Sequence, residues 1–305
     1  MKEHSPIRGV CFALTAGICW GFSGTLGQYL FTCKNISPSW LTVWRMLISG
    51  AILLAGSAFR QPDALRQIWR NRKDALWLIA FGVCGLMAVQ LCYMQAIRYS
   101  NAGTATAVQY LGEALILLYA CVKGRRWPRK VELLALALAL TGIFLLSTHG
   151  DFGKMVLSRE GLLWGLAAAV ALMLYTLLPV RLISRYGSAP VTGYGLLLGG
   201  AVLAILTRPW EQKMGLDMGI LLGMAGIILI GTVLSFTLYL QSVVDLGGVK
   251  AGLLSSVETV SAPFFAVVWL RTPFEKMDYL GFGCILLMVV LLAVPEIRKT
   301  RRESC

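Results

Sequence analysis

Long apolar runs, each almost free of charged residues, recur along the chain and restrict what it can fold into. A transmembrane helix needs about 20 consecutive apolar residues, which is close to the length of these runs. The runs are continuously apolar rather than alternating, which favours helices over a β-barrel. Charged residues make up only 14% of the chain, whereas about a quarter is typical of soluble domains. We therefore expect an all-α membrane protein with ten transmembrane helices, at about residues 8–30, 40–59, 75–97, 102–121, 131–147, 161–180, 189–206, 218–240, 249–270 and 277–294.

Basic residues lie mainly at the ends of these runs. The net charge of +13 could suggest a nucleic-acid partner, but basic flanks that set membrane topology explain it better, and we expect no nucleic acid to bind. An N-terminus inside the cell places the basic loops 60–74, 122–130 and 181–188 in the cytoplasm, together with the C-terminal tail. Both termini are therefore predicted to be cytoplasmic. The first run is too long for a cleavable signal peptide and lacks a small-residue cleavage site.

An internal repeat divides the chain into two halves. A displacement of 146 residues superposes Tyr93 on Tyr239, Gln95 on Gln241, Arg125 on Arg271 and Lys130 on Lys276. The repeat unit is five helices, taken as residues 1–150 and 151–305. Because five is odd, the second copy enters the membrane from the opposite side. Inverted repeats of this kind are typical of alternating-access transporters, which bind their substrate near the middle of the membrane.

Two carboxylates interrupt the apolar runs near their centres. Glu113 lies in the predicted span 102–121 and Glu258 lies in the predicted span 249–270. A charged side chain at the bilayer centre costs roughly 2.5–3.5 kcal/mol on insertion scales. A residue kept there at that cost usually faces a cavity and handles ions, protons or polar solutes. A purely structural buried carboxylate is the alternative.

Polar residues near the two carboxylates fall on shared helix faces. Thr106, Gln109, Tyr110 and Glu113 are spaced so that they share one face of a helix. Hydrocarbon cannot satisfy their hydrogen bonds, so this face is expected to meet protein or water. Interhelical hydrogen bonding alone is the simpler explanation for the Ser and Thr residues. The candidate substrate-binding residues are Glu113, Glu258, Tyr110, Gln109, Tyr93, Tyr239, Gln90 and Trp20.

A few other residues within the spans are weaker candidates for a role in the site or in helix packing. Arg45 lies in the second predicted span, and its side chain is long enough to reach the outer membrane surface, so we interpret it as structural or gating. Glycines near Trp20 mark the first helix as an element that packs closely or bends. Tyr175 and Tyr194 are further candidate cavity aromatics.

The sequence offers little to support catalysis or metal binding. The eight cysteines form no CxxC pair, and the only histidines, His4 and His149, lie outside the predicted spans. No motif for nucleotide phosphate, nucleophile activation or metal ligation is present. We therefore expect no metal, no cofactor and no enzymatic activity.

Several segments resemble a known family of transporters. They are "CWGFSGTLGQYLF" (19–31), "YSNAGTATAVQYL" (99–111), "IGTVLSFTLYLQSVVDLGGVKAGLLSSVETVSAPF" (230–264) and "KMDYLGFGCILLMVVLL" (276–292). Together they resemble EamA-domain members of the drug/metabolite transporter superfamily, and most closely the ten-helix bacterial inner-membrane permeases of the carboxylate, amino-acid and amine type. The resemblance implies two EamA repeats and a central cavity lined by helices 1, 3, 4, 6, 8 and 9. In many members a proline follows the glutamate that matches Glu258, whereas here Thr259 follows. Members often carry a proline near the position of Glu113.

These observations predict a secondary active transporter. The expected substrate is a small polar metabolite, an amino acid or amine-like solute, moved across the bacterial inner membrane by alternating access. Glu258 and Glu113 would accept the coupling proton or Na⁺, and cation–π contacts with aromatic residues would suit a cationic group. A lipid or lipid-headgroup flippase and, less well supported, a membrane-embedded enzyme are the alternatives. The protein is expected as a monomer or homodimer in the lipid bilayer.

Overall fold

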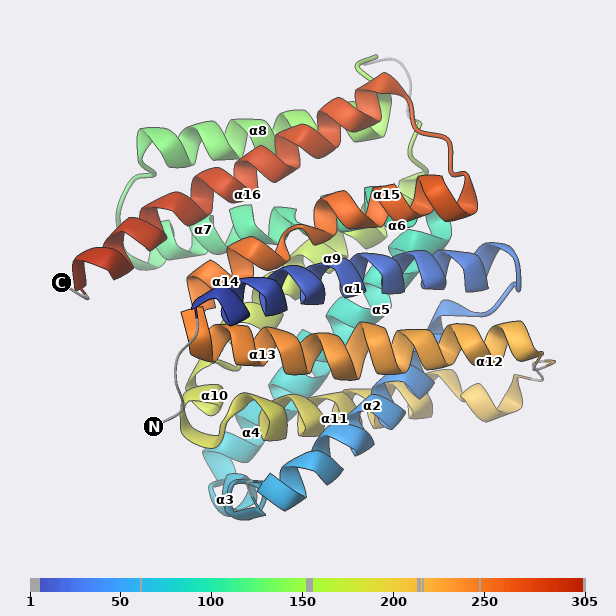
Figure 1. Cartoon of the computed structure of the whole chain (residues 1–305), viewed down its shortest axis with the longest axis vertical. Coiled ribbons are helices and arrows are strands. Elements are labelled where there is room, and N and C mark those ends of the chain that lie inside the picture. The colour runs from blue at the N-terminus through green and yellow to red at the C-terminus, as the bar shows by residue number, and fades with distance from the viewer. Residues whose placement is uncertain are drawn as a thin grey trace.

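The computed structural model describes residues 6–303, except 61, 152–155, 213–214, 216 and 247. These residues form helices that lie side by side in a bundle (Figure 1). The first half contains α1 (Pro6–Thr32), α2 (Pro38–Arg60), α3 (Pro62–Arg70), α4 (Arg72–Ala80), η1 (Phe81–Met87), α5 (Ala88–Tyr99), α6 (Ala102–Gln109), α7 (Leu111–Lys123) and α8 (Lys130–Thr148). The second contains α9 (Arg159–Leu177), α10 (Val180–Tyr186), α11 (Ser188–Thr207), η2 (Pro209–Glu211), α12 (Met218–Ala225), η3 (Gly226–Leu234), α13 (Ser235–Leu246), α14 (Gly248–Ser255), α15 (Glu258–Leu270) and α16 (Lys276–Glu303).

The predicted all-α membrane fold is confirmed. Within the described residues, eight helical runs are long and apolar enough to cross a membrane, from Ile7–Thr32 through to Met218–Val243. They coincide with the first eight predicted spans to within a few residues. The ninth predicted span is divided between α14 and α15, and the tenth lies within α16. The predictions of one continuous helix over 102–121 and over 249–270 were therefore wrong, because the chain turns at Tyr110 and at residues 256–257.

The two halves share their irregularities as well as their helices. The third span of each half contains a π-helical stretch, η1 in the first and η3 in the second. The fourth span of each half is broken, at Tyr110 between α6 and α7 and at residues 256–257 between α14 and α15. Tyr110 and Ser256 are separated by the same 146 residues as the sequence repeat. Both kinds of irregularity occur often at functional sites.

Helix packing between the halves is reciprocal. α1 packs on α13 and α15 of the other half, and α9 packs in the same way on α5, α6 and α7. α2 packs on α11, and α8 packs on α16. In Figure 1 α1 runs from left to right whereas α9 runs from right to left. The broken fourth spans therefore lie beside the first span of the opposite half.

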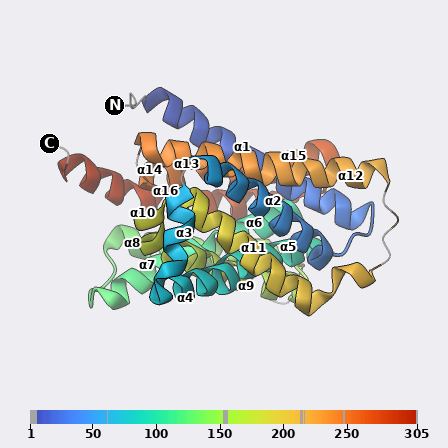
Figure 2. The same ribbon diagram turned by 90° about the horizontal axis from the view of Figure 1, so that it is seen from below.

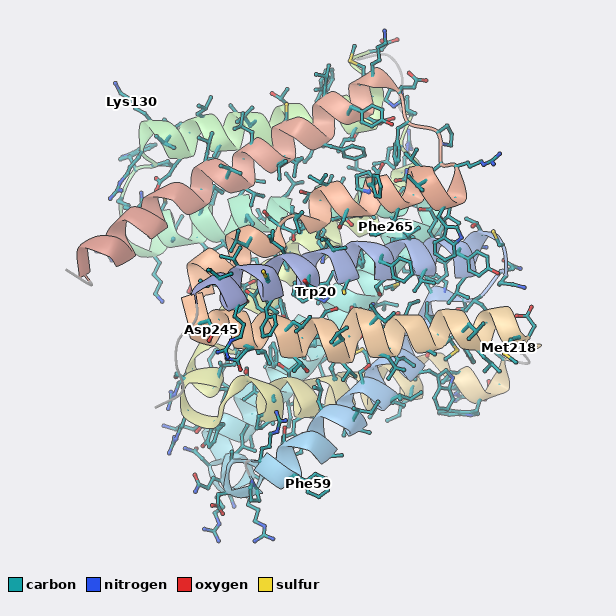
Figure 3. The ribbon with its side chains drawn as sticks, viewed as in Figure 1. Trp20, Phe59, Lys130, Met218, Asp245 and Phe265 are labelled. Atoms are coloured by element: carbon teal, nitrogen blue, oxygen red, sulfur yellow. The ribbon has the colours of Figure 1, made fainter. Side chains whose placement is uncertain are left out.

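Ion pairs fasten both ends of α1. At one end Arg8 Nη2 lies 2.8 Å from the Asp245 carboxylate on α13. At the other end Lys34 Nζ lies 2.6 Å from the carboxylate of Asp217, which caps the N-terminus of α12. Figure 3 labels Asp245 and Met218, the first residue of α12, at opposite ends of the bundle. α1 is thus tied to the third span of the second half on both sides of the membrane.

Candidate functional site

The two helix breaks place both carboxylates at the start of a helical segment. Glu258 is the first residue of α15 and Glu113 is the third residue of α7. Hydrogen bonds tighten at each break: the Glu113 amide donates to the Tyr110 carbonyl and the Thr259 amide to the Ser256 carbonyl. The N-terminal end of a helix carries a partial positive charge, which favours a negative group beside it. Both carboxylates thus lie where the backbone favours negative charge within an apolar span.

A hydrogen bond joins the two halves at these breaks. The Tyr110 hydroxyl donates to Glu258 Oε2 at 3.1 Å. Tyr110 also lies within electrostatic range of Glu113 and Tyr239. Glu258 in turn lies within electrostatic range of Arg45 on α2. Side chains from four helices (α2, α7, α13 and α15) and from the break between α6 and α7 therefore contribute one cluster, which contains both predicted carboxylates.

The carboxylates are neither sealed within the protein nor fully exposed. Glu113, Glu258, Tyr110, Gln109 and Tyr239 are all half-buried. Each therefore keeps some surface that the protein does not cover, although the spans around it are apolar.

Trp20 brings an aromatic face to this cluster from α1. Its ring centroid lies 5.3 Å from that of Tyr239, with an angle of 52° between the planes. A second contact, to Phe236, has an edge-to-face geometry at 5.7 Å. Figure 3 labels Trp20 at about the middle of α1. Tyr175, which lies within electrostatic range of Tyr239, extends the aromatic group toward α9.

Tyr93 and Gln90 lie deeper than the other candidates. Tyr93 is 7% exposed and Gln90 is 8% exposed. The Tyr93 hydroxyl is 2.8 Å from Thr106 Oγ1 on α6, and a Cβ on Gly24 would lie 2.6 Å from the same hydroxyl. Tyr93 thus belongs to the wall that holds α5, α6 and α1 together.

Arg45 differs from its sequence-based interpretation. Its side chain is directed into the bundle, not toward the membrane surface, and is only 4% exposed. Nε donates to Thr232 Oγ1 at 2.9 Å and Nη2 donates to the Gly231 carbonyl at 3.4 Å, both in η3. Nη1 is buried and has no hydrogen-bond partner among the described residues. The π-helical stretch thus holds a guanidinium that keeps one free donor group.

Tyr194 does not join the cluster. Its hydroxyl donates to the Leu65 carbonyl, and its ring packs on Trp69 at 5.4 Å, next to α3. An aromatic group that sequence reasoning missed lies between α1 and α15, where Trp269 stacks on Phe22 and on Tyr29. Residues about 240 positions apart form these pairs, so no local pattern could have indicated them.

Most Ser and Thr candidates bond to helix backbone. Ser255 Oγ donates to the Gly252 carbonyl at 2.9 Å, and Ser235 Oγ donates to the Ile230 carbonyl at 2.5 Å. Ser261 Oγ donates to the Gly17 carbonyl on α1 at 3.4 Å. These hydroxyls satisfy structural hydrogen bonds, in agreement with the simpler explanation for them. Within the described part of the chain, no three His, Cys, Asp or Glu side chains gather as a metal site.

The chain is similar to known transporters along nearly its whole length. The sequence model of the EamA-like transporter family matches residues 7–148 and again residues 159–294. The uncharacterized inner membrane transporter YicL of Salmonella typhimurium is 36% identical over 297 residues, which cover 97% of this chain and 99% of YicL. The transporter YetK of Bacillus subtilis is 23% identical over 71% of this chain and 67% of YetK. A protein of known crystal structure is similar in fold, with a TM-score of 0.66 and 19% identity over 96% of this chain and 99% of its own.

Proposed function

The chain belongs to the EamA-like transporter family, and we propose that it carries a small metabolite with a protonated amino group across the inner membrane by alternating access. Membership of the family makes the protein a membrane transporter and not an enzyme. The main support for this substrate is the hydrogen bond between Tyr110 and Glu258, which brings the two helix breaks and their carboxylates into one site.

The chemistry of the cluster suits a cationic group. Glu258 and Glu113 supply two negative charges, and Trp20 and Tyr239 supply aromatic faces beside them. Such faces attract ammonium groups by about 0.5–2 kcal/mol, depending on desolvation. An amino acid or an amine would therefore bind through its amino group. Tyr110, Gln109, Gln90 and Tyr93 would shape the remainder of the site.

Arg45 favours an amino acid over a simple amine. A buried donor without a partner costs about 1–3 kcal/mol, and more when it is charged. The Nη1 group of Arg45 is such a donor, and it lies in the same electrostatic neighbourhood as Glu258. A substrate carboxylate would supply the missing acceptor, while the two glutamates receive the amino group. A proton or Na⁺ bound with the zwitterion would balance the remaining negative charge.

The repeats supply the parts that alternating access requires. In such transporters the two halves rock about a site at their interface. The ion pairs Arg8–Asp245 and Lys34–Asp217 lie at opposite ends of α1, where opening on each side would separate them in turn. We place both termini in the cytoplasm, because basic loops concentrate on the side where α1 begins. The similarity to the inner membrane transporter YicL supports a location in the inner membrane.

Transport in proteoliposomes tests this function. A thermal-shift screen of the amino acids and their decarboxylated amines first identifies ligands, because a bound ligand raises stability by mass action. Uptake of the best ligand, with and without an imposed pH or Na⁺ gradient, then follows for Glu258→Gln and Glu113→Gln. Glu275→Gln, at a side chain that is 73% exposed, is the matched control.

We expect Glu258→Gln and Glu113→Gln each to reduce uptake at least tenfold and to remove its dependence on the gradient. Undiminished, gradient-dependent uptake in both variants would exclude the carboxylates from the mechanism. Uptake of the amine with rejection of the amino acid would retain the function and refute the role given to Arg45. Movement of labelled phospholipid between leaflets, without uptake of any soluble compound, would favour a flippase instead.

A further inference from the structure

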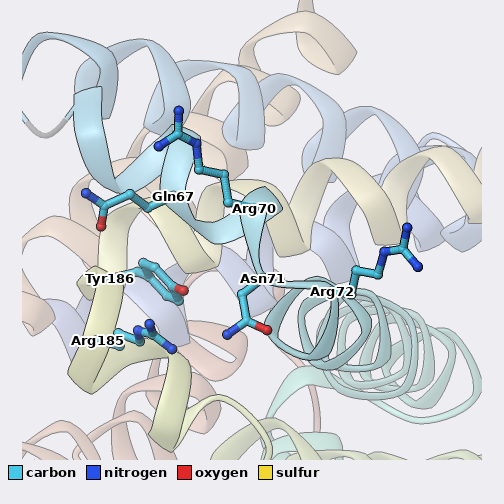
Figure 4. Close-up of a pocket in the computed structure, with 6 residues that line it drawn as sticks. All are labelled: Gln67, Arg70, Asn71, Arg72, Arg185 and Tyr186. Atoms are coloured by element: carbon cyan, nitrogen blue, oxygen red, sulfur yellow. The ribbon is translucent and has the colours of Figure 1, made fainter.

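A pocket separate from the central cluster opens at one end of the bundle. It has a volume of about 520 Å³ and lies where α3, the start of α4 and the end of α10 meet (Figure 4). The residues that line it are Gln67, Arg70, Asn71, Arg72, Arg185 and Tyr186. None of them belongs to the proposed transport site.

The pocket presents positive charge and hydrogen-bond donors. In Figure 4 Arg185 lies next to Tyr186, while the Arg70 and Arg72 side chains extend outward on either side of the pocket. Asn71 Oδ1 already accepts from the amides of Lys73 and Asp74, which leaves its Nδ2 as a donor. Such a lining suits a ligand with several acceptor oxygens and negative charge.

One buried carboxylate pairs with Arg185, and the other two arginines of the pocket are left without it. Asp74 is 1% exposed and accepts hydrogen bonds of 2.8 Å from Arg185 Nη1 and from the Tyr186 hydroxyl. Arg181 Nη2 lies 3.8 Å from the other oxygen of Asp74, so the single charge of this carboxylate is shared by the two arginines of α10. No described side chain forms an ion pair with Arg70 or Arg72, so these two guanidinium groups remain available to a ligand.

The surroundings of the pocket place it at the membrane surface. α3 lies at right angles to the spans in both Figure 1 and Figure 2, so it runs along the plane of the membrane. Phe59, at the end of α2, is 90% exposed, and Trp69, on α3, is 43% exposed. Aromatic side chains in these positions are typical of the layer where lipid headgroups meet acyl chains.

We propose that this pocket binds the phosphate of an anionic phospholipid headgroup. The exposed side chains of Arg70 and Arg72 would turn toward the phosphate beside Arg185, while Phe59 and Trp69 contact the acyl chains nearby. Basic pockets at the ends of transmembrane helices recognise anionic headgroups through this combination of charge and position. The bound lipid would fasten α3 to α10, which belong to different halves of the protein.

Native mass spectrometry of the detergent-purified full chain tests the proposal. Phosphatidylglycerol is added in one arm, phosphatidylcholine in a second, and inorganic phosphate competes with phosphatidylglycerol in a third. Each basic residue near an anionic headgroup contributes roughly a fivefold factor in affinity, so the double variant Arg70→Gln/Arg72→Gln should bind phosphatidylglycerol roughly 30-fold more weakly. The control Arg125→Gln/Arg159→Gln removes two exposed charges that lie outside the pocket and away from α3, and should bind as the wild type does.

Three results would overturn the proposal. These are equal retention of phosphatidylcholine, unchanged binding in the double variant, and displacement of the lipid by inorganic phosphate at equal concentration, which would assign the pocket to free phosphate. Retention by the wild type should also fall as NaCl is raised from 0.05 to about 0.5 M, because salt screens the charges. This second measurement does not depend on how the variants fold. Retention that does not change with salt would contradict a site built on charge.

Discussion

Gly21 on α1 allows a close approach between the two halves, and its replacement tests the packing directly. A Cβ added at Gly21 would lie 2.7 Å from the backbone nitrogen of Ala262 on α15, whereas ordinary contacts begin at 3.4 Å. The side chain of Ser261 nearby can rotate, but a backbone atom within a helix cannot. Gly21→Ala should therefore move α1 and α15 apart by about 0.7 Å.

Overpacking of this kind costs about 1–3 kcal/mol. Alanine also gains about 1 kcal/mol over glycine through its helix propensity, which offsets part of that cost. Gly56→Ala is the matched control, because Gly56 lies in α2 and a Cβ there meets nothing within 4 Å. The propensity gain is common to both variants, so the difference in stability between them reports the packing cost alone.

Thermal unfolding in detergent, followed by tryptophan fluorescence, measures the difference. A shift of 1 kcal/mol moves the Tm of a protein of this size class by about 2–4 °C, so Gly21→Ala should melt roughly 2–12 °C below Gly56→Ala. Equal melting temperatures would refute the claim that α1 packs against α15 without room for a methyl group. Uptake should also fall in Gly21→Ala and remain normal in Gly56→Ala.

Three further changes have defined outcomes. Asp74→Asn removes the charge that accepts from Arg185 and Tyr186, and should lower stability by about 1.5–3 kcal/mol in the same melting assay; an unchanged melting temperature would contradict the burial of that charge. Tyr93→Phe loses one hydrogen bond to Thr106 and should cost about 0.5–1.5 kcal/mol, with ligand affinity retained if Tyr93 is part of the wall. The hydrogen bond from Lys34 lowers the pKa of Asp217, so the pair stabilises the fold above about pH 4 and is lost as the pH falls through the lowered pKa. Melting curves of Asp217→Asn should lack that acid-side decline, and an identical decline in the variant would assign it to other groups.

Much of the candidate site could be named from the sequence but not assembled from it. Glu113 and Glu258 were recognisable because a carboxylate in an apolar run is rare and costly. That Tyr110 reaches Glu258 could not be predicted, because 148 residues separate them. The break in 249–270 was also missed, since apolar composition reports the length of a span and not whether its backbone is continuous.

The direction of the Arg45 side chain could not be predicted from the sequence either. An arginine in an apolar span is able either to extend along the helix to the surface or to turn inward. The sequence does not distinguish these outcomes, because the choice depends on which acceptors a neighbouring helix offers. The π-helical stretch η3 supplies the Thr232 hydroxyl and the Gly231 carbonyl, and the side chain turns inward to them.

The amino-acid sequence alone determined the membrane class, the positions of eight spans and the repeat, because hydropathy is a local property that accumulates along a segment. Tertiary structure alone decided which side chains meet. The reciprocal packing of α1 and α9 brings the two breaks together, and contacts between residues far apart in the chain depend on that packing and not on any segment by itself.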